Sequence, residues 1–407
     1  MPAHEGANVK DVARIAEVDL EKWAQFLLEH SLAGPSTGAR VMIKGEAVAW
    51  PLMEVLERRV IEMGATPDVL LIAPNNDRGR VWSSNMGRYA TPDQLAAVPA
   101  WLIQRYQEMT HYIEILGHAD PQAFQGLAPE QAQRMMAADR PFVDIRVSKP
   151  WVLTLYPTAA EAAFEGMSLA SYTDFIVRAS TVDPAPLKFA EEKLEPLFQS
   201  GRQVRIVTHH PGAGRELVLR MDITHSIPRL CYGLRNFPDG EIFTSPNANS
   251  VEGEIYVDLP VTHGGVDMQG IHLRFEGGRI VEYSAQAGQK QLETIVETDA
   301  GARRLGEFAL GMNPGFDKVL KNALFVEKVG GTLHIAIGAS YEDCYVEDPG
   351  SDAGRRRLET LTEEGIVNVS AQHVDIVTDF RPGGAGRQVF IDDTELVVRD
   401  GVWVIAP

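Results

Sequence analysis

A histidine and an aspartate stand two residues apart near the end of the chain, in the stretch SAQHVDIVTD at residues 370–379. The valines and the isoleucine of this stretch favour an extended, partly buried strand. Alternate residues of a strand share one face, so the side chains of His373 and Asp375 point to the same side. The pattern leaves two interpretations open, an inert ion pair in the core or two ligands of one metal ion.

A second histidine, His334, lies in the run GGTLHIAIGASY at residues 330–341. The alternation predicts a strand whose leucine and isoleucines take one face. His334 then projects from the other face, where small neighbours leave room beside the imidazole ring. Tyr341 follows just past the predicted strand end, where its phenol could reach the same space. A histidine satisfied within the core is the alternative to a metal ligand here.

Two glutamates begin or end apolar stretches. Glu241 directly follows an Asp-Gly turn and begins an apolar strand in FPDGEIFTSP, at residues 237–246. Glu327 ends an apolar strand in LFVEKVGG, at residues 324–331. Neither glutamate indicates a function when it is taken alone.

A third glutamate, Glu307, lies in a predicted helix that spans residues 291–311 and is broken or re-capped near Thr298 and Asp299. Glu307 lies at the edge of the apolar stripe of this helix, beside Gly306. A glycine inside a helix costs about 1 kcal/mol of helix propensity relative to alanine. This cost indicates that another backbone segment approaches closely and that Glu307 faces inward, although a solvated surface glutamate is the commoner case.

Together these side chains are two imidazoles and four carboxylates in one half of the chain. Mixed histidine and carboxylate ligands suit zinc, cobalt, manganese or iron. The cysteines, Cys231 and Cys344, form no CxxC pattern that would indicate a thiolate site. One catalytic zinc ion keeps about three protein ligands. Six ligands therefore predict two divalent ions about 3.5–4 Å apart, bridged by a carboxylate and a shared hydroxide, and such cations also offset the cost of burying several carboxylates together.

Composition limits the other function classes. The chain has 407 residues, 44% of them hydrophobic, which is enough for two domains of ordinary size. Its net charge of -18 disfavours nucleic acid and anionic membranes as partners. No apolar run approaches the length of about 20 residues that spans a bilayer, and the N-terminal stretch lacks the apolar core of a signal peptide. We therefore expect a cytoplasmic protein.

Nucleotide binding finds little support in the sequence. The chain has no Walker A loop and no HExxH motif, and GGAGRQ at residues 383–388 has the wrong spacing for a dinucleotide fingerprint.

The pattern of apolar segments changes near residue 201. Before it, predicted helices alternate with apolar strands at residues 39–45, 68–74 and 150–157, which is typical of a mostly parallel sheet covered by helices. After it, short alternating segments lie between glycine and aspartate turns, which predicts antiparallel hairpins. We therefore predict an α/β N-terminal domain at residues 1–201. An α+β, antiparallel-β-rich C-terminal domain at residues 202–407 would carry the metal site and the catalysis.

Five segments carry a resemblance to a known family. GEIFTSP, TDAGARRLGEFAL, HIAIGASY and HVD stand in the order and approximate spacing of the aminopeptidase T/aminopeptidase S metallopeptidases. LYPTAAEAAFEGMSLASYTDF, at residues 155–175, is similar to the first domain of these thermophilic aminopeptidase-like proteins. The resemblance covers nearly the whole chain, and the four C-terminal motifs are specific in combination.

The resemblance implies three glutamate ligands. The metal-binding glutamates of the family fall on Glu241 and Glu307, with Glu307 as the bridging carboxylate. A third family glutamate precedes the strand histidine across a loop of variable length, and this role falls on Glu327.

The other family positions fall on His334 for the strand histidine, Tyr341 for the active-site tyrosine, and His373 with Asp375 for the closing His-x-Asp. The resemblance implies a metallo-aminopeptidase that removes the N-terminal residue of short peptides with two ions of zinc, cobalt or manganese. The ions would polarise the scissile carbonyl and activate a bridging water, and Tyr341 would donate a hydrogen bond to the oxyanion. Glu307 and Tyr341 are thus the expected catalytic residues. A homodimer is also implied, with active sites that face an enclosed cavity.

Two other function classes stay open. Some relatives of this fold resemble non-haem iron(II) dioxygenases that open dihydroxypyridine rings, and His334, His373 and Asp375 would make their triad around one iron(II) ion. That interpretation leaves the three glutamates without a role, so we favour two metals and a peptidase. A non-catalytic protein with a structural metal site is the third alternative, although structural zinc sites are usually closed and cysteine-rich.

Overall fold

The computed structural model describes residues 12–73, 81–119, 127–212, 214–224, 226–263, 266–382 and 386–407. The stretch GGAGRQ falls partly outside these residues, as does the N-terminal stretch. The chain forms two compact units, one of Met1–Val182 with Gly233–Pro238 and one of Asp183–Tyr232 with Asp239–Pro407. Among the helices of the described residues, none is long and apolar enough to cross a membrane.

The first unit is built on a four-stranded parallel sheet with the strand order β2-β1-β3-β4. Its strands are β1 (Arg40–Glu46), β2 (Thr66–Ile72), β3 (His111–Leu116) and β4 (Trp151–Leu155). Six of the seven residues of β1 are buried, as expected of a parallel strand that is covered on both faces. The structure thus confirms the predicted α/β class of this part.

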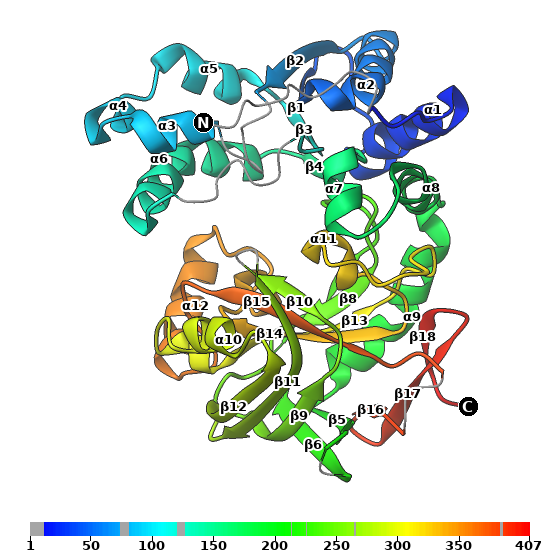
Figure 1. The fold of residues 1–407 in the computed structure, drawn as a ribbon, viewed down its shortest axis with the longest axis vertical. Coiled ribbons are helices and arrows are strands. Elements are labelled where there is room, and N and C mark those ends of the chain that lie inside the picture. The colour runs from blue at the N-terminus through cyan, green and yellow to red at the C-terminus, as the bar shows by residue number, and fades with distance from the viewer. Residues whose placement is uncertain are drawn as a thin grey trace. The chain divides into compact units, whose positions relative to one another are not determined.

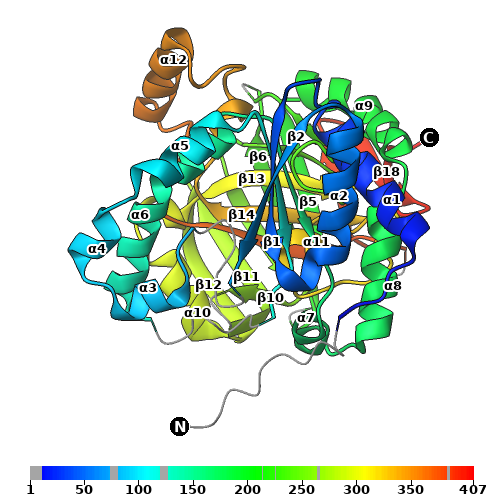
Figure 2. The same ribbon diagram turned by 90° about the horizontal axis from the view of Figure 1, so that it is seen from above.

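Helices cover both faces of this sheet (Figure 2). The helices α1 (Glu17–Gln25) and α2 (Trp50–Glu62) lie on one side, and α5 (Ala100–Glu108) and α6 (Pro129–Val147) lie on the other. Shorter helices complete the unit: α3 (Ser84–Tyr89), α4 (Pro92–Ala96), α7 (Ala159–Phe164) and α8 (Leu169–Ser180).

The helix α9 (Pro184–Ser200) opens the second unit. It buries Leu187, Leu194 and Phe198 in the apolar core of that unit, where Phe198 stacks on Phe308 with ring centroids 5.7 Å apart. The contacts of the chain therefore divide it before α9, whereas the boundary predicted at residue 201 falls after this helix.

The second unit contains two antiparallel sheets, which confirms the predicted antiparallel-β-rich class (Figure 1). The larger one has nine strands: β5 (Gln203–His210), β6 (Arg215–Asp222), β9 (Glu252–Val257), β10 (Val261–His263), β11 (Val266–Glu276), β12 (Arg279–Ala287), β16 (Gln388–Ile391), β17 (Thr394–Arg399) and β18 (Val402–Ile405). The helices α10 (Gln289–Val296), α11 (Ala323–Val326) and α12 (Asp352–Glu363) complete the unit.

The smaller sheet has five strands in the order β15-β14-β13-β8-β7. They are β7 (Arg229–Cys231), β8 (Glu241–Thr244), β13 (Leu305–Gly311), β14 (Thr332–Gly338) and β15 (His373–Asp379). Leu333, Ile335 and Ile337 of β14 lie in the apolar core that both sheets share. Period 2 along a strand then places His334 on the opposite face, which confirms the predicted alternation.

The helix predicted at residues 291–311 is wrong in its second half. The helix α10 ends at Val296, and Glu307 lies instead on the strand β13. Every residue of β13 is buried, and the strand is paired with β8 on one side and β14 on the other. Pairing on both edges and burial on both faces outweigh the helix-like pattern of this segment.

Gly306 confirms the close backbone approach that its position predicted. A Cβ atom on Gly306 would lie 1.9 Å from the carbonyl oxygen of Ala339. The glycine is therefore needed for contact between β13 and the segment that follows β14, and not for a bend in a helix.

The predicted strand that ends at Glu327 is also wrong. Glu327 directly follows the short helix α11 and is its C-cap residue. Asn322 explains the helix, because its side chain accepts a hydrogen bond from the backbone N–H of Leu324 and caps the first turn.

Gly306→Ala is expected to lower the free energy of unfolding by about 1–3 kcal/mol, because the added methyl group must displace the Ala339 carbonyl. Urea unfolding followed by circular dichroism measures the change. Gly212→Ala is the matched control: its methyl group would first meet the side chain of His210, at 3.4 Å, and its effect should stay within about 0.5 kcal/mol. Equal losses in both variants would contradict a tight contact at Gly306.

Candidate metal centre

Five of the six predicted ligands lie on neighbouring strands of the five-stranded sheet. Glu241 begins β8, Glu307 lies on β13, His334 lies on β14, and His373 and Asp375 lie on β15. Pairing of these strands in the order β8, β13, β14, β15 brings together residues that are far apart in the sequence.

Alanine residues of the five-stranded sheet lie between the proposed ligands. Glu307 and Asp375 both pair with Ala336 of β14, one from each side. His334 pairs with Ala309 of β13 in the same way. Because alanine carries a single methyl group, the longer side chains can converge over it.

Glu307 lies between the two imidazoles. One of its oxygens, Oε1, is 3.3 Å from Nε2 of His334, and the other, Oε2, is 3.1 Å from Nε2 of His373. His334 Nε2 is also 3.3 Å from Oε2 of Glu241, and His373 Nε2 is 3.5 Å from Oδ1 of Asp375. A carboxylate that directs one oxygen to each histidine has the placement of a bridging ligand.

The six residues form three overlapping groups, each with ligand atoms within 4.8 Å of one another. These groups are Glu241 with Glu307 and His334, Glu307 with His373 and Asp375, and Glu327 with His334 and Asp375. We call the six residues the ligand cluster. The structure thus brings together all the ligands that the sequence predicted.

Several atoms of the ligand cluster have the properties of metal ligands. Glu241 Oε2 and Asp375 Oδ1 are buried and have no hydrogen-bond partner among the described residues. Buried polar atoms are rarely left in this state without an ion or a water. His373 meets the carbonyl oxygen of Ala339 through Nδ1, at 2.8 Å. A carbonyl can only accept, so Nδ1 carries a hydrogen, and Nε2, which faces Glu307, is the nitrogen that would bind a metal ion in place of a proton. The residues therefore fit a site for divalent cations.

The raised pKa values of the two histidines also indicate a site that attracts positive charge. Burial alone would lower the pKa of His334, but Glu307 and Glu241 raise it to about 9. Burial would likewise lower the pKa of His373, but Asp375 and Glu307 raise it to about 11. Protons on the two imidazoles therefore supply the positive charge that a divalent cation would otherwise bring.

The pKa values of the carboxylates Glu307 and Glu327 shift in opposite directions. Burial would raise the pKa of Glu307, but hydrogen bonds from His334 and His373 lower it below its usual value. Glu327 receives no such bonds from the histidines, and burial together with Asp375 and Glu241 raises its pKa to about 8. In the absence of metal, Glu327 therefore takes up a proton more readily than a solvated glutamate, although the Lys328 ammonium opposes this shift.

Tyr341 lies beside the cluster. Its ring packs edge-on against the imidazole of His373, with ring centroids 4.7 Å apart, and against Phe243 at 5.1 Å. The residue is 43% exposed, so part of it faces solvent although its ring packs on His373 and Phe243. Loss of solvent around the ring and the charges of Glu307 and Asp375 raise the pKa of Tyr341 well above its usual value, which keeps the phenol protonated.

Sequence reasoning missed two charged residues at the cluster, Lys328 and Asp239. The Lys328 ammonium forms ion pairs with Glu241, with Glu327 at 2.9 Å and with Asp239 at 3.7 Å. Because lysine is mostly exposed in proteins, the position of Lys328 directly after Glu327 did not predict a buried residue at the cluster. Asp239 was interpreted as a turn residue of the Asp-Gly pair.

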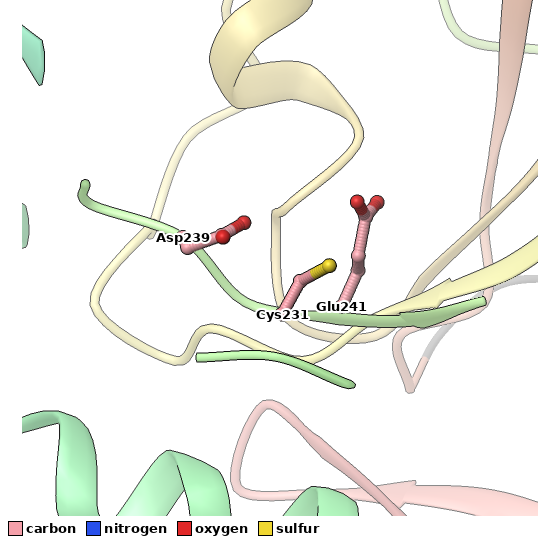
Figure 3. A group of neighbouring side chains, drawn as sticks. All are labelled: Cys231, Asp239 and Glu241. Atoms are coloured by element: carbon pink, nitrogen blue, oxygen red, sulfur yellow. The ribbon is translucent and has the colours of Figure 1, made fainter. Parts of the chain in front are cut away.

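Asp239 also belongs to a fourth group of neighbouring ligand atoms, with Cys231 and Glu241 (Figure 3). The Lys328 ammonium already provides a cation for both carboxylates of this group. Burial and the charges of Asp239 and Glu241 raise the pKa of the Cys231 thiol well above its usual value, so the sulfur is a poor ligand. We therefore do not interpret this group as a metal site.

Comparison with known proteins gives consistent matches over most of the chain. The model of the thermophilic metalloprotease (M29) family matches residues 16–195 and 224–403. Aminopeptidase T of Thermus thermophilus is 29% identical, over 66% of this chain and 73% of its own length. Aminopeptidase PepS of Streptococcus thermophilus is 25% identical, over 95% of this chain and 98% of its own length.

A solved structure shares the fold. Wild-type AmpT from Thermus thermophilus superposes with a TM-score of 0.72 and 22% sequence identity, and the match covers 96% of this chain and 98% of that one.

Divalent metal is expected to stabilise the second unit. Zinc, cobalt or manganese at about 100 times its dissociation constant should add about 2.7 kcal/mol to the free energy of unfolding for each ion that binds, because the ion binds the folded state. Thermal unfolding with metal and with a chelator measures the shift. His334→Ala is the control and should lose most of the shift, since His334 belongs to two of the three groups. A wild-type melting temperature that is the same with metal and with chelator would contradict the site.

Proposed function

The chain belongs to the thermophilic metalloprotease (M29) family, and from this premise we propose that it removes the N-terminal residue of short peptides with two divalent metal ions. Its relation to aminopeptidase T and aminopeptidase PepS makes it a metallo-aminopeptidase, which is a hydrolase. The number of ions and the roles of single residues belong to the proposal.

The placement of Glu307 carries this proposal. Its two oxygens face two different histidines, and each histidine belongs to a separate group of ligand atoms that also contains Glu307. Glu241 and His334 would complete one metal site, and His373 and Asp375 would complete the other. Glu327 would add a sixth ligand from the turn after α11.

The bound ions would supply Lewis-acid polarisation of the scissile carbonyl and a water of lowered pKa. Glu307 would hold both sites in register, because its two oxygens face the two different histidines. Tyr341 would donate a hydrogen bond to the oxyanion that develops on the carbonyl oxygen. The free amine of the substrate would bind a carboxylate of the cluster or a metal ion.

The ring-cleaving dioxygenase alternative finds less support. It needs His334, His373 and Asp375 around a single iron(II) ion. Among the described residues, none of the groups of close ligand atoms contains both histidines. The three glutamates of the cluster would also have no role around one iron ion.

We further propose that the protein acts in the cytoplasm as a homodimer, with short peptides as substrates and neither nucleic acid nor membranes as partners. The net charge of -18 supports the exclusion of polyanionic partners.

Elemental analysis is expected to find two zinc, cobalt or manganese ions per chain after loading and desalting. Glu307→Gln should retain less than one ion, because Glu307 contributes to both proposed sites. Glu282→Gln is a control on an exposed strand position and should retain two ions. One iron per chain in the wild-type protein would instead favour the dioxygenase.

Tyr341→Phe is expected to lower kcat for a leucine anilide by about 10²–10³-fold, the usual cost of one lost oxyanion donor. KM and metal content should change little, because the phenyl ring still packs on His373. Tyr89→Phe, at a residue that is 79% exposed in the first unit, should leave kcat unchanged. An unchanged kcat in Tyr341→Phe would remove the tyrosine from the mechanism.

A further inference from the structure

Lys328 is a buried cation at the edge of the ligand cluster. Its side chain is 2% exposed, and it follows Glu327 in the turn after α11. Burial of an ammonium is costly unless carboxylates pair with it closely. Lys328 has three such partners in Glu241, Glu327 and Asp239.

Two of these partners are members of the ligand cluster, and they belong to different groups of ligand atoms. Glu241 is grouped with Glu307 and His334, whereas Glu327 is grouped with His334 and Asp375. One ammonium therefore contacts a carboxylate from each of the two groups that contain His334.

The ammonium contacts only one oxygen of Glu241. Lys328 Nζ binds Oε1, while Oε2 faces His334 Nε2 at 3.3 Å and has no hydrogen-bond partner among the described residues. Lys328 likewise contacts Oε1 of Glu327. In Glu241 the oxygen that Lys328 contacts is thus separate from the oxygen that remains for a metal ion.

Asp239 and Asn313 fix the lysine in place. Asp239 is buried and lies outside the ligand cluster, and its side chain lies next to that of Glu241 at the start of β8 (Figure 3). Asn313 donates its backbone N–H to the carbonyl of Lys328 at 3.0 Å and its side-chain amide to the carbonyl of Asp239 at 2.5 Å. The backbone of Lys328 is therefore tied to Asn313, which follows β13, and its ammonium to Asp239 and Glu241 at the start of β8.

We propose that Lys328 is a positioning residue of the metal centre, which holds one oxygen each of Glu241 and Glu327 so that their other oxygens face the metal ions. This inference rests on the proposed function, because it takes both glutamates to be ligands. Hydrogen bonds to ligating carboxylates orient them, and loss of such a bond typically costs 10–100-fold in metal affinity.

A lysine that orients ligands and a lysine that acts only through its charge predict opposite effects of its removal on metal affinity. A positive charge near a divalent cation repels it, so removal of a lysine that acted only through its charge would tighten metal binding. Removal of a lysine that orients two ligands would weaken metal binding. The sign of the change therefore decides between the two roles.

The experiment compares the affinity of the full chain for cobalt and for zinc, each measured alone by competition with a chromophoric chelator. Lys328→Met is expected to weaken the binding of at least one ion by 10–100-fold. Lys328→Arg keeps a cation and should restore part of the affinity. Lys44→Met is the matched control, since Lys44 is also a buried lysine and is paired with Glu114 at 3.0 Å in the first unit. The affinity of the Lys44→Met protein for metal should equal that of the wild type.

Equal or tighter metal binding by Lys328→Met would overturn the proposal for Lys328, while a wild type that binds two ions and cleaves a leucine anilide would keep the proposed function. A wild type that binds no metal would overturn both. If Lys328→Met does not fold by circular dichroism, Lys328→Gln keeps a polar end at the same place and is measured instead, with the same expected loss and the same contrary result.

Discussion

Repulsion among carboxylates is the constraint on which the second unit depends. Glu241, Glu307, Glu327 and Asp375 converge beside one sheet, three of them on neighbouring strands, and little solvent reaches them. Charges of one sign so close together cannot all stay ionised away from water without cations. The chain itself supplies compensating charge through the protonated imidazoles of His334 and His373 and the ammonium of Lys328. Divalent metal would replace the protons on the imidazoles, and it is the partner that these oxygen and imidazole ligands suit.

The five-stranded sheet determines how these carboxylates are placed relative to one another. Antiparallel pairing places Glu307 and Asp375 on either side of Ala336, so the backbone register sets the distance between the ligands. Gly306 takes part although it carries no side chain. Its missing Cβ lets the carbonyl of Ala339 approach β13, and the same carbonyl accepts the hydrogen bond that orients His373. The backbone contact at Gly306 and the orientation of a proposed metal ligand are therefore coupled through one oxygen atom.

Sequence periodicity predicted the strand ligands because period 2 is a local signal. His334 among small neighbours and His373 two residues before Asp375 could both be assigned to one face of a strand. Glu307 could not, since its segment comes shortly after the helix α10 and only pairing with β8 and β14 makes it a strand. The strand predicted to end at Glu327 was wrong for a related reason, because a single capped turn of helix resembles the end of an apolar strand. Lys328 gave no local signal at all, since its partner Glu241 lies 87 residues away.

Charge balance in the cluster supports two divalent ions over one. Lys328 lies next to Asp239, which is not among the proposed ligands, and these two charges offset each other. The four carboxylates of the ligand cluster then carry four negative charges when all are ionised. One divalent ion would leave half of that charge buried without compensation, whereas two would balance it. The raised pKa of Glu327 reflects the same imbalance, since burial and the charges of Asp375 and Glu241 disfavour its ionised form. Asp239 thus lets Lys328 orient two ligands without removing the negative charge that two metal ions require.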